Sequence, residues 1–218
     1  MIIGEGVSAV FKPKGPTSHD IIDQIRRLTG VQKVGHAGTL DPLAEGVLVV
    51  GVGATATKRL GEIVAKEKEY LATIWLGINS TTDDEEGEKT IKAYAIEPSE
   101  NQIAYAISQL IGRIDQKPPI YSAIKIFGEK AYAIARAGRS VELKSRPVEI
   151  KSIEIISYRW PELVLKIVCG AGVYIRSVAR DLGEKLETGG YLTGLTRTRV
   201  GEYRLEEAIR LPPPKSAR

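Results

Sequence analysis

The stretch Gly35-His36-Ala37-Gly38-Thr39-Leu40-Asp41-Pro42-Leu43 decides how the rest of the chain is interpreted. It places one of only two histidines five residues before an aspartate, in a loop that glycine interrupts and proline follows. A carboxylate at a Gly/Pro turn is presented on a loop rather than buried in a regular element. Asp41 is therefore a candidate helix cap, surface charge or nucleophile, and the motifs around it must decide among these.

The composition of the 218-residue chain indicates a folded protein without structural disulfides. Hydrophobic residues make up 43%, which is enough for a sizeable core. One cysteine and two histidines exclude an internal disulfide framework and disfavour a Cys/His zinc site. Residues 1–6 lack the pattern of a signal peptide, and no stretch approaches the ~18 apolar residues of a membrane span. We therefore expect a cytoplasmic protein without membrane association.

Positive charge is concentrated in one segment. The chain carries a net charge of +4 with a pI near 9.0. Residues 113–151 alone hold nine basic and four acidic side chains, so the rest of the chain is close to neutral. A basic segment on a near-neutral body is typical of a nucleic-acid contact surface. Because Lys and Arg are common on any surface, charge alone leaves a merely solvated face equally open.

Hydrophobic periodicity and turn signals predict an α+β fold with a mixed sheet. Strands are expected over residues 7–11, 47–50, 70–76, 148–158, 163–169 and 191–200. Helices are expected from a cap at Thr17 or Ser18 to Gly30, over 54–64, over 99–111 and over 173–186, with short helices at 129–137 and 206–210. The acidic run 83–88 is expected to be a solvated hairpin loop, and residues 212–218 a disordered tail.

Two motifs for other chemistries are weak. The segment Gly51-Val52-Gly53-Ala54-Thr55-Ala56 fits the dinucleotide-binding pattern G-x-G-x-x-A. The acidic residue of that pattern should end the next strand, whereas Glu69 precedes it. Ser18, His19 and Asp20 are neighbours in the sequence and cannot point at one another as a catalytic triad. A dinucleotide-binding oxidoreductase therefore stays only a minor alternative.

Three other side chains suit a site built on a carboxylate. Tyr174 and Arg176 follow a glycine turn at the start of a predicted helix, where an arginine could pair with a carboxylate and keep it ionised. Tyr70, at the start of a strand, could stack on a nucleobase. Each also has a purely structural explanation, since Tyr70 could pack against a sheet and Arg176 could form a surface ion pair.

Six motifs in a fixed order make the chain resemble the TruB-type tRNA pseudouridine synthases along nearly its full length. They lie at residues 12–18, 35–43, 68–70, 118–125, 172–183 and 195–201. The resemblance implies a pseudouridine-synthase-like mixed, mostly antiparallel sheet flanked by helices. It also implies one catalytic domain over residues 1–211 with an RNA-gripping insertion at 115–147, which agrees with the basic segment.

The resemblance further implies a reaction. The family isomerises uridine to pseudouridine at position 55 in the T loop of tRNA: the N1–C1′ bond breaks, the base turns over, and C5 joins C1′. No cofactor or metal is needed, because the isomerisation is redox-neutral. The matching site residues are Asp41 as the catalytic aspartate, Arg176 as its partner, Tyr70 stacking on the base, Tyr174 and Leu195 lining the uracil pocket, and His36 beside the displaced base.

Binding to the tRNA T arm would rest on phosphate contacts and would weaken with salt. The expected contacts to the RNA backbone are Lys12, Lys125, Lys130, Arg136 and Arg139. The target base must leave its folded loop, at a cost of a few kcal/mol. We expect a monomer.

Some features depart from the family pattern. Ala37 replaces a usual hydroxyl residue, Glu45 replaces a usual threonine, and Thr196 replaces a common arginine. The sequence stops at Arg218, whereas many relatives continue into a PUA-type RNA-binding domain, so we expect no dependence on a guide RNA. A non-catalytic RNA chaperone that uses the same pocket is the alternative function.

Overall fold

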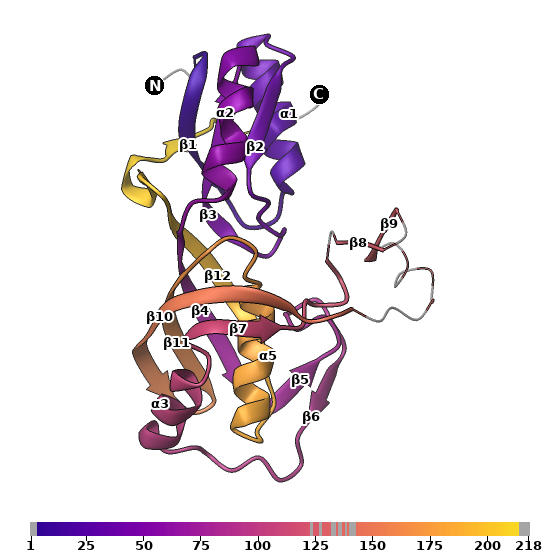
Figure 1. Ribbon diagram of the computed structural model, residues 1–218, viewed down its shortest axis with the longest axis vertical. Helices are drawn as coiled ribbons and strands as arrows, with labels where there is room; N and C mark the ends of the chain where they lie inside the picture. The colour runs from indigo at the N-terminus through magenta and orange to yellow at the C-terminus, as the bar shows by residue number, and fades with distance from the viewer. Residues whose placement is uncertain are drawn as a thin grey trace. The chain divides into compact units, whose positions relative to one another are not determined.

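The computed structural model describes residues 4–122, 124–126, 128–131, 134, 137, 139 and 143–213. The chain packs as two compact units, of which one comprises Met1–Leu71 and Gly194–Arg218 and the other Ala72–Thr193. Two strands, β4 (Lys68–Leu76) and β12 (Gly190–Val200), continue along the chain from one unit into the other (Figure 1). Each unit combines strands with helices, which confirms the predicted α+β class.

The sheet of the first unit is centred on β3 (Glu45–Val52). Strand β1 (Gly6–Lys12) pairs antiparallel with it over its whole length, and β2 (Val34–Ala37) pairs antiparallel with its second half. The end of β12 lies parallel to the start of β3. The short strands β13 (Tyr203–Arg204) and β14 (Ile209–Arg210) extend the sheet beside β12 and β1 respectively.

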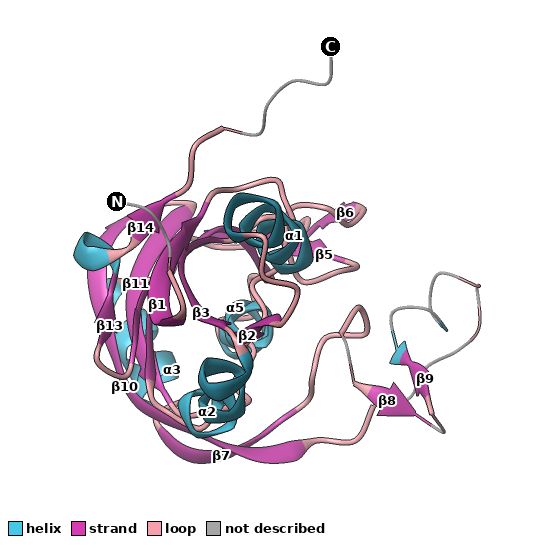
Figure 2. Cartoon of the chain, turned by 90° about the horizontal axis from the view of Figure 1, so that it is seen from above, coloured by secondary structure: helices cyan, strands magenta, loops and turns pink. Residues whose placement is uncertain are grey.

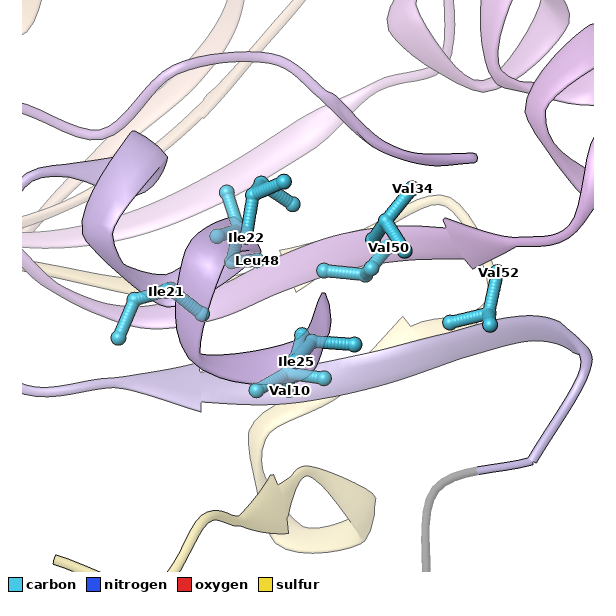
Figure 3. Close-up of a cluster of buried hydrophobic side chains, with 8 residues drawn as sticks. All are labelled: Val10, Ile21, Ile22, Ile25, Val34, Leu48, Val50 and Val52. Carbon is cyan, nitrogen blue, oxygen red and sulfur yellow. The ribbon is translucent and has the colours of Figure 1, made fainter. Parts of the chain in front are cut away.

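Two helices cover opposite faces of this sheet, α1 (Ser18–Thr29) and α2 (Ala54–Val64), as Figure 2 shows. Every second residue of β3, namely Leu48, Val50 and Val52, packs with the apolar side of α1 (Figure 3). The alternate residues Val47 and Val49 pack with α2. The continuous apolar run in this strand follows from burial on both of its faces.

Local sequence signals set the ends of α1. Thr17 accepts a hydrogen bond from Asp20 N through its side chain, and Asp20 Oδ2 accepts one from Thr17 N at 2.7 Å, which completes a capping box. Gly30 ends the helix with φ at +72°, a left-handed conformation that glycine adopts without strain. These signals fix where α1 begins and ends, and its first residue, Ser18, hydrogen-bonds to the loop after β2.

The second unit carries the strand order β4–β11–β10–β7, with β11 at Glu162–Cys169, β10 at Arg146–Arg159 and β7 at Gly112–Gln116. The ladders β10–β11 and β10–β7 are antiparallel. The helices of this unit with described bounds are α3 (Glu100–Ser108) and α5 (Ile175–Lys185), and β5 (Ile78–Ser80) pairs with β6 (Lys89–Ile91) as a hairpin. The pairs β1–β14 and β3–β12 are parallel, whereas β1–β3, β2–β3, β12–β13, β10–β11 and β7–β10 are antiparallel, so the sheet is mostly antiparallel as predicted.

Two short helices were predicted wrongly in whole or in part. Residues 206–210 form a 3-10 turn, Leu205–Glu207, and then strand β14, because Ile209 pairs with Val10 and packs on the core under α1. Within residues 129–137, Glu129–Lys130 is strand β9, paired with β8 (Lys125–Ile126). Ala131 and Ile134 are helical, as predicted, and positions 132, 133, 135 and 136 lie outside the described residues. The predicted tail is also outside them from residue 214. No helix in the described part of the chain is long and apolar enough to cross a membrane.

Candidate active site

Asp41 lies in the loop between β2 and β3, where its side chain is half-buried. The backbone of this loop is tied to the start of α1 and to the turn before it. Ser18 Oγ donates to Leu40 O at 2.9 Å and accepts from Leu40 N at 2.8 Å. The N–H of Gly15 donates to Pro42 O at 2.8 Å. The residues on both sides of Asp41 are thus fixed by bonds from another segment.

Arg197 hydrogen-bonds to the backbone of the first half of the same loop. Its side chain is 1% exposed, and its guanidinium donates to Gly38 O at 3.0 Å, Thr39 O at 3.4 Å and Val47 O at 2.7 Å. Gly46 allows this approach, because a Cβ there would lie 2.3 Å from Arg197 O and its φ is +109°. The carbonyls of Gly38 and Thr39 therefore point at a buried cation rather than at solvent.

Lys12 holds the second half of the loop. It is fully buried, and its Nζ donates to Ala44 O at 2.6 Å and Pro13 O at 3.0 Å. Burial lowers the pKa of Lys12 to about 8, while the charge of Asp41 raises it and that of Arg197 lowers it further. The carboxylate of Asp41 thus lies within electrostatic reach of Lys12. The burial of Lys12 contradicts its predicted contact with the RNA backbone and makes it a support of the loop.

His36 lies on β2, half-buried, five residues before Asp41. Its Nδ1 is buried and has no hydrogen-bond partner among the residues that the structure describes. Burial lowers the pKa of His36, the charges of Arg197 and His19 lower it further, and a backbone hydrogen bond with Gly38 acts in the opposite direction. Burial and these charges both favour the neutral imidazole, a form suited to occupying space in a pocket rather than to carrying charge.

Tyr70 and Leu195 are the remaining predicted residues of the first unit. Tyr70 lies on β4 and is 7% exposed, so little of its ring is open to a stacking partner in this conformation. The adjacent Glu69 accepts a hydrogen bond from Thr198 Oγ1 at 2.8 Å, which ties β4 to β12. Leu195 lies on β12 and is half-buried.

Arg176 belongs to the second unit and lies on the first turn of α5. It is 6% exposed, and its Nη1 donates to Asp84 Oδ2 at 3.1 Å and to Thr82 O at 3.3 Å. Its Nη2 donates to Tyr121 O at 3.0 Å. Asp84 is 2% exposed and also accepts from Glu86 N at 3.0 Å. The guanidinium is thus oriented from two directions by a buried carboxylate and two carbonyls.

The burial of Asp84 corrects the prediction that the acidic run 83–88 is simply a solvated loop. Asp83, with φ at +60°, pairs with Arg180 at 2.7 Å, one helical turn after Arg176. Burial raises the pKa of Asp83 to about 6, although Arg180 and Arg176 both lower it. The sequence signal that could have revealed this arrangement is two arginines four residues apart on a helix and two consecutive aspartates elsewhere.

Tyr174 immediately precedes α5 and is half-buried. Gln116 bonds to its backbone, and the guanidinium of Arg146 lies 5.0 Å from the centre of its ring. Neither Gln116 nor Arg146 was predicted to act at the site. Ser122, next to the Tyr121 carbonyl that holds Arg176, has a buried Oγ that finds no hydrogen-bond partner within the described part of the chain.

Of the predicted contacts to the RNA backbone, Arg139 has a described side chain. It is exposed and pairs with Glu129 at 2.6 Å. Arg136 and the side chains of Lys125 and Lys130 lie outside the described residues, and these contacts stay predictions.

Two departures from the family pattern meet in the structure. Thr196 and Glu45 are Cα partners in the parallel pairing of β12 with β3, and Thr196 Oγ1 donates to Glu45 Oε1 at 3.3 Å. A hydroxyl beside a carboxylate makes a satisfied pair, so the two replacements are compatible with each other.

The structure divides the predicted site residues between its two units. The first unit holds His36, Asp41, Tyr70 and Leu195, and the second holds Tyr174 and Arg176.

Residues 26–175 match the family model described as TruB family pseudouridylate synthase (N terminal domain). Curated relatives include tRNA pseudouridine synthase B of Mycobacterium sp. (strain KMS), 47% identical over 213 residues, which cover 96% of this chain and 71% of the relative. The protein of the same name from Thermobifida fusca (strain YX) is 47% identical over 217 residues, covering 96% of this chain and 74% of the relative.

Solved structures with a similar fold include one titled as a Cbf5-Nop10-Gar1 complex, with a TM-score of 0.73, 28% identity and 94% of this chain covered. Another is titled as an H/ACA RNP bound to a substrate RNA containing 2′-deoxyuridine, with a TM-score of 0.70, 26% identity and 94% coverage. The present chain spans 52% and 50% of those two chains, about half of their length.

Proposed function

The chain belongs to the TruB family of pseudouridylate synthases, and from this premise we propose that it isomerises uridine to pseudouridine at position 55 in the T loop of tRNA. The class of enzyme, an isomerase that makes pseudouridine, follows from the family and from relatives 47% identical over nearly the whole chain. The names of those relatives support tRNA as the substrate. The position in the T loop and the roles of the residues below belong to the proposal.

The main observation behind the proposal is that buried side chains hold the backbone of the loop that carries Asp41. Buried Lys12 and Arg197 bind carbonyls at its two ends, and Ser18 binds both backbone groups of Leu40. Holding a catalytic group in a fixed pose lowers the entropic part of a reaction barrier. A loop that served only to connect two strands would not need two fully buried cations, each of which is costly to desolvate.

In the proposed reaction Asp41 is the catalytic carboxylate. The N1–C1′ bond of uridine breaks, the base turns over, C5 forms a bond to C1′, and the proton on C5 leaves while N1 gains one. Atoms and electrons balance within the substrate, so the proposal includes no cofactor. The carboxylate could attack C1′, attack C6 or remove a proton at C2′, and the proposal covers all three routes.

The other residues act on the base and on the charge of Asp41. Tyr70 stacks on the uracil, which requires its ring to become more accessible than the 7% exposure seen without RNA. Stacking of this kind contributes about 1–3 kcal/mol per base. Tyr174 and Leu195 line the pocket, His36 fills space beside the displaced base as a neutral imidazole, and Arg176 supplies the positive charge that the reacting carboxylate needs.

The proposal places the enzyme in the cytoplasm as a monomer that binds the T arm of tRNA directly, without a guide RNA. Phosphate contacts from the basic segment 113–151 supply much of the affinity. Arg139 is the described member of the proposed contacts, and its side chain is 55% exposed, as a phosphate ligand requires.

The test is a pseudouridine assay on an isolated T-arm stem-loop and on full-length tRNA, with no other RNA present. Wild-type protein is expected to convert both. Asp41→Asn, which keeps the size of the side chain and removes its charge, is expected to bind both RNAs and convert neither. Residual turnover above a few per cent would contradict the catalytic role of Asp41.

The same assay separates the alternatives. Binding without conversion by the wild-type protein would favour a non-catalytic tRNA chaperone over the enzyme. Conversion of a different uridine, located by sequencing the product, would keep the activity and overturn the assignment to position 55. Conversion that appears only when a second RNA is added would overturn guide independence.

A further inference from the structure

Gln116 holds the main chain of Tyr174. It is the last residue of β7 and is 1% exposed. Its Oε1 accepts from Tyr174 N at 2.8 Å, and its Nε2 donates to Tyr174 O at 3.2 Å. One side-chain amide thus pairs with both backbone groups of a residue 58 positions away. Such a buried amide is satisfied only while Tyr174 keeps this position.

Arg146 holds the ring of the same tyrosine. Its guanidinium carbon lies 5.0 Å from the centre of the Tyr174 ring, within the range of a cation–π contact. Its Nη2 donates to Gly172 O at 2.5 Å, which anchors the guanidinium to the turn that leads into α5. The ring therefore faces a cation that is itself fixed to the preceding backbone.

Gln116 and Arg146 act from one place in the fold. They are Cα partners in the antiparallel β7–β10 ladder and form its terminal pair, the one at the end of β7 and the start of β10. Side chains of directly opposed residues in such a ladder lie on the same face of the sheet. A single rung therefore presents an amide and a guanidinium to the same tyrosine.

We propose that Gln116 and Arg146 are positioning residues, which set the backbone and the ring of Tyr174 in the uracil pocket. The proposal rests on the proposed function, because that function gives Tyr174 its role against the base. The proposal requires no contact between either residue and the reacting base. Both act through Tyr174, and through it on the start of α5, which carries Arg176.

The kinetic test compares Gln116→Met and Arg146→Met with the wild-type chain in single-turnover reactions at saturating enzyme. Gln116→Met is expected to lower the rate about tenfold while the Kd for tRNA changes less than about twofold, because the base is bound but poorly placed. Arg146→Lys, which keeps a cation but loses the planar fork, is expected to fall between wild type and Arg146→Met. Unchanged rates in both methionine variants would overturn the proposal.

The matched control is Tyr158→Phe. This change also removes a side-chain to main-chain hydrogen bond in the second unit, from Tyr158 Oη to Pro98 O at 2.9 Å, and Tyr158 is not part of the site. It is expected to leave the single-turnover rate unchanged. An equal loss of rate in Tyr158→Phe would show that general destabilisation explains the data and would overturn the proposal.

A double-mutant cycle separates positioning from a structural role. If Gln116 acts through the ring of Tyr174, Gln116→Met should lower the rate less than about twofold in a Tyr174→Ala background. The full tenfold loss in that background would mean that Gln116 acts by another route, which contradicts the proposal.

A measurement without RNA keeps this inference separate from the proposed function. With 3-fluorotyrosine placed at position 174 of the full chain, Gln116→Met and Arg146→Met are each expected to shift and broaden the ¹⁹F resonance, and Tyr158→Phe is not. An unchanged resonance in both methionine variants would overturn the positioning role. If the resonance moves but the wild-type protein makes no pseudouridine, the proposed function has failed and the positioning of Tyr174 has not.

Discussion

Arg176 and Asp84 form an ion pair in which Nη1 lies 3.1 Å from Oδ2, and both side chains are buried. Asp84 is itself held by the N–H of Glu86, so it cannot turn away from the arginine without losing a second bond. The pair fixes the guanidinium that the proposed function assigns to the reacting carboxylate. An arginine that served only as a surface charge would need no buried counter-ion.

Removing the charge of Asp84 is expected to destabilise the protein and to slow the reaction. Asp84→Ala leaves Arg176 buried without its counter-ion, and breaking one side of a buried pair typically costs about 3–5 kcal/mol. Asp84→Asn keeps a hydrogen-bond acceptor and is expected to cost less. Urea denaturation measures the free energy of unfolding, and single-turnover assays measure the rate.

Glu86→Gln is the matched control, because Glu86 lies in the same loop with an exposed side chain. It is expected to change the free energy of unfolding by less than about 0.5 kcal/mol. A loss of stability in Asp84→Ala no larger than that of the control would contradict the importance of the buried pair.

Lys12 is expected to make the protein more stable as pH rises in the alkaline range. Its pKa in the folded state is about 8, below the ordinary 10.5, so the unfolded chain binds more protons between these values. The penalty for the buried charge is present in full below pH 8 and disappears as pH rises to 10.5. Relative to Lys12→Met, the wild-type protein should gain up to about 3 kcal/mol across that window.

The comparison needs a second lysine variant. Lys14→Met changes an exposed lysine two residues away and should show no such gain. Urea denaturation of the three proteins between pH 7.5 and 10.5 decides the matter. Parallel stability curves for wild type and Lys12→Met would mean that Lys12 carries no buried charge.

Asp83 is expected to lower the stability of the protein as pH rises through the acid range, the opposite of the effect of Lys12. Burial raises its pKa from 3.8 to about 6, so between these values the folded state binds more protons than the unfolded state. The contribution of Asp83 to stability is therefore highest below pH 3.8 and falls as pH rises to 6. Relative to Asp83→Asn, the wild-type protein should lose up to about 3 kcal/mol over that window.

Thermal unfolding of both proteins at several pH values between 3.5 and 6.5 measures this difference. Other carboxylates titrate in the same range, but their contributions cancel when the two proteins are compared. A difference between the proteins that does not change with pH would show that Arg180 keeps Asp83 ionised throughout.

Sequence patterns predicted the elements that rest on local or periodic signals. The predicted helix start at residue 99 and the predicted strand at 47–50 are confirmed, the first because Ser99 caps α3 and the second because residues 47–50 form part of β3. The strand β14 was predicted as a helix because its two residues depend on pairing with β1, which no short window of sequence reveals.

Site residues that lie within a sequence motif could be predicted. Residues that join the site through contacts with distant segments could not. Asp41 lies in a motif that could be read directly. Asp84 looked like one charge in an acidic run, and only its contact with Arg176, 92 positions away, shows that it is buried. Lys12 was taken for a surface cation, because sequence does not reveal that its ammonium faces the carbonyl of Ala44.

We expect the basic segment 113–151 to contribute to tRNA affinity, and Arg139 is the residue at which this can be tested. Its guanidinium pairs with Glu129 at 2.6 Å, and both side chains are about half-exposed, so the pair is weak and a phosphate can replace it. Substituting Arg136 and Arg139 together with Gln is expected to weaken tRNA binding and to reduce the slope of log K against log salt by about 1 for each phosphate that is no longer neutralised. Glu129→Gln frees Arg139 and is expected to bind tRNA as tightly as the wild type or more so. Filter binding between 50 and 300 mM salt measures all three proteins, and an unchanged slope in the double variant would place the phosphate contacts elsewhere on the chain.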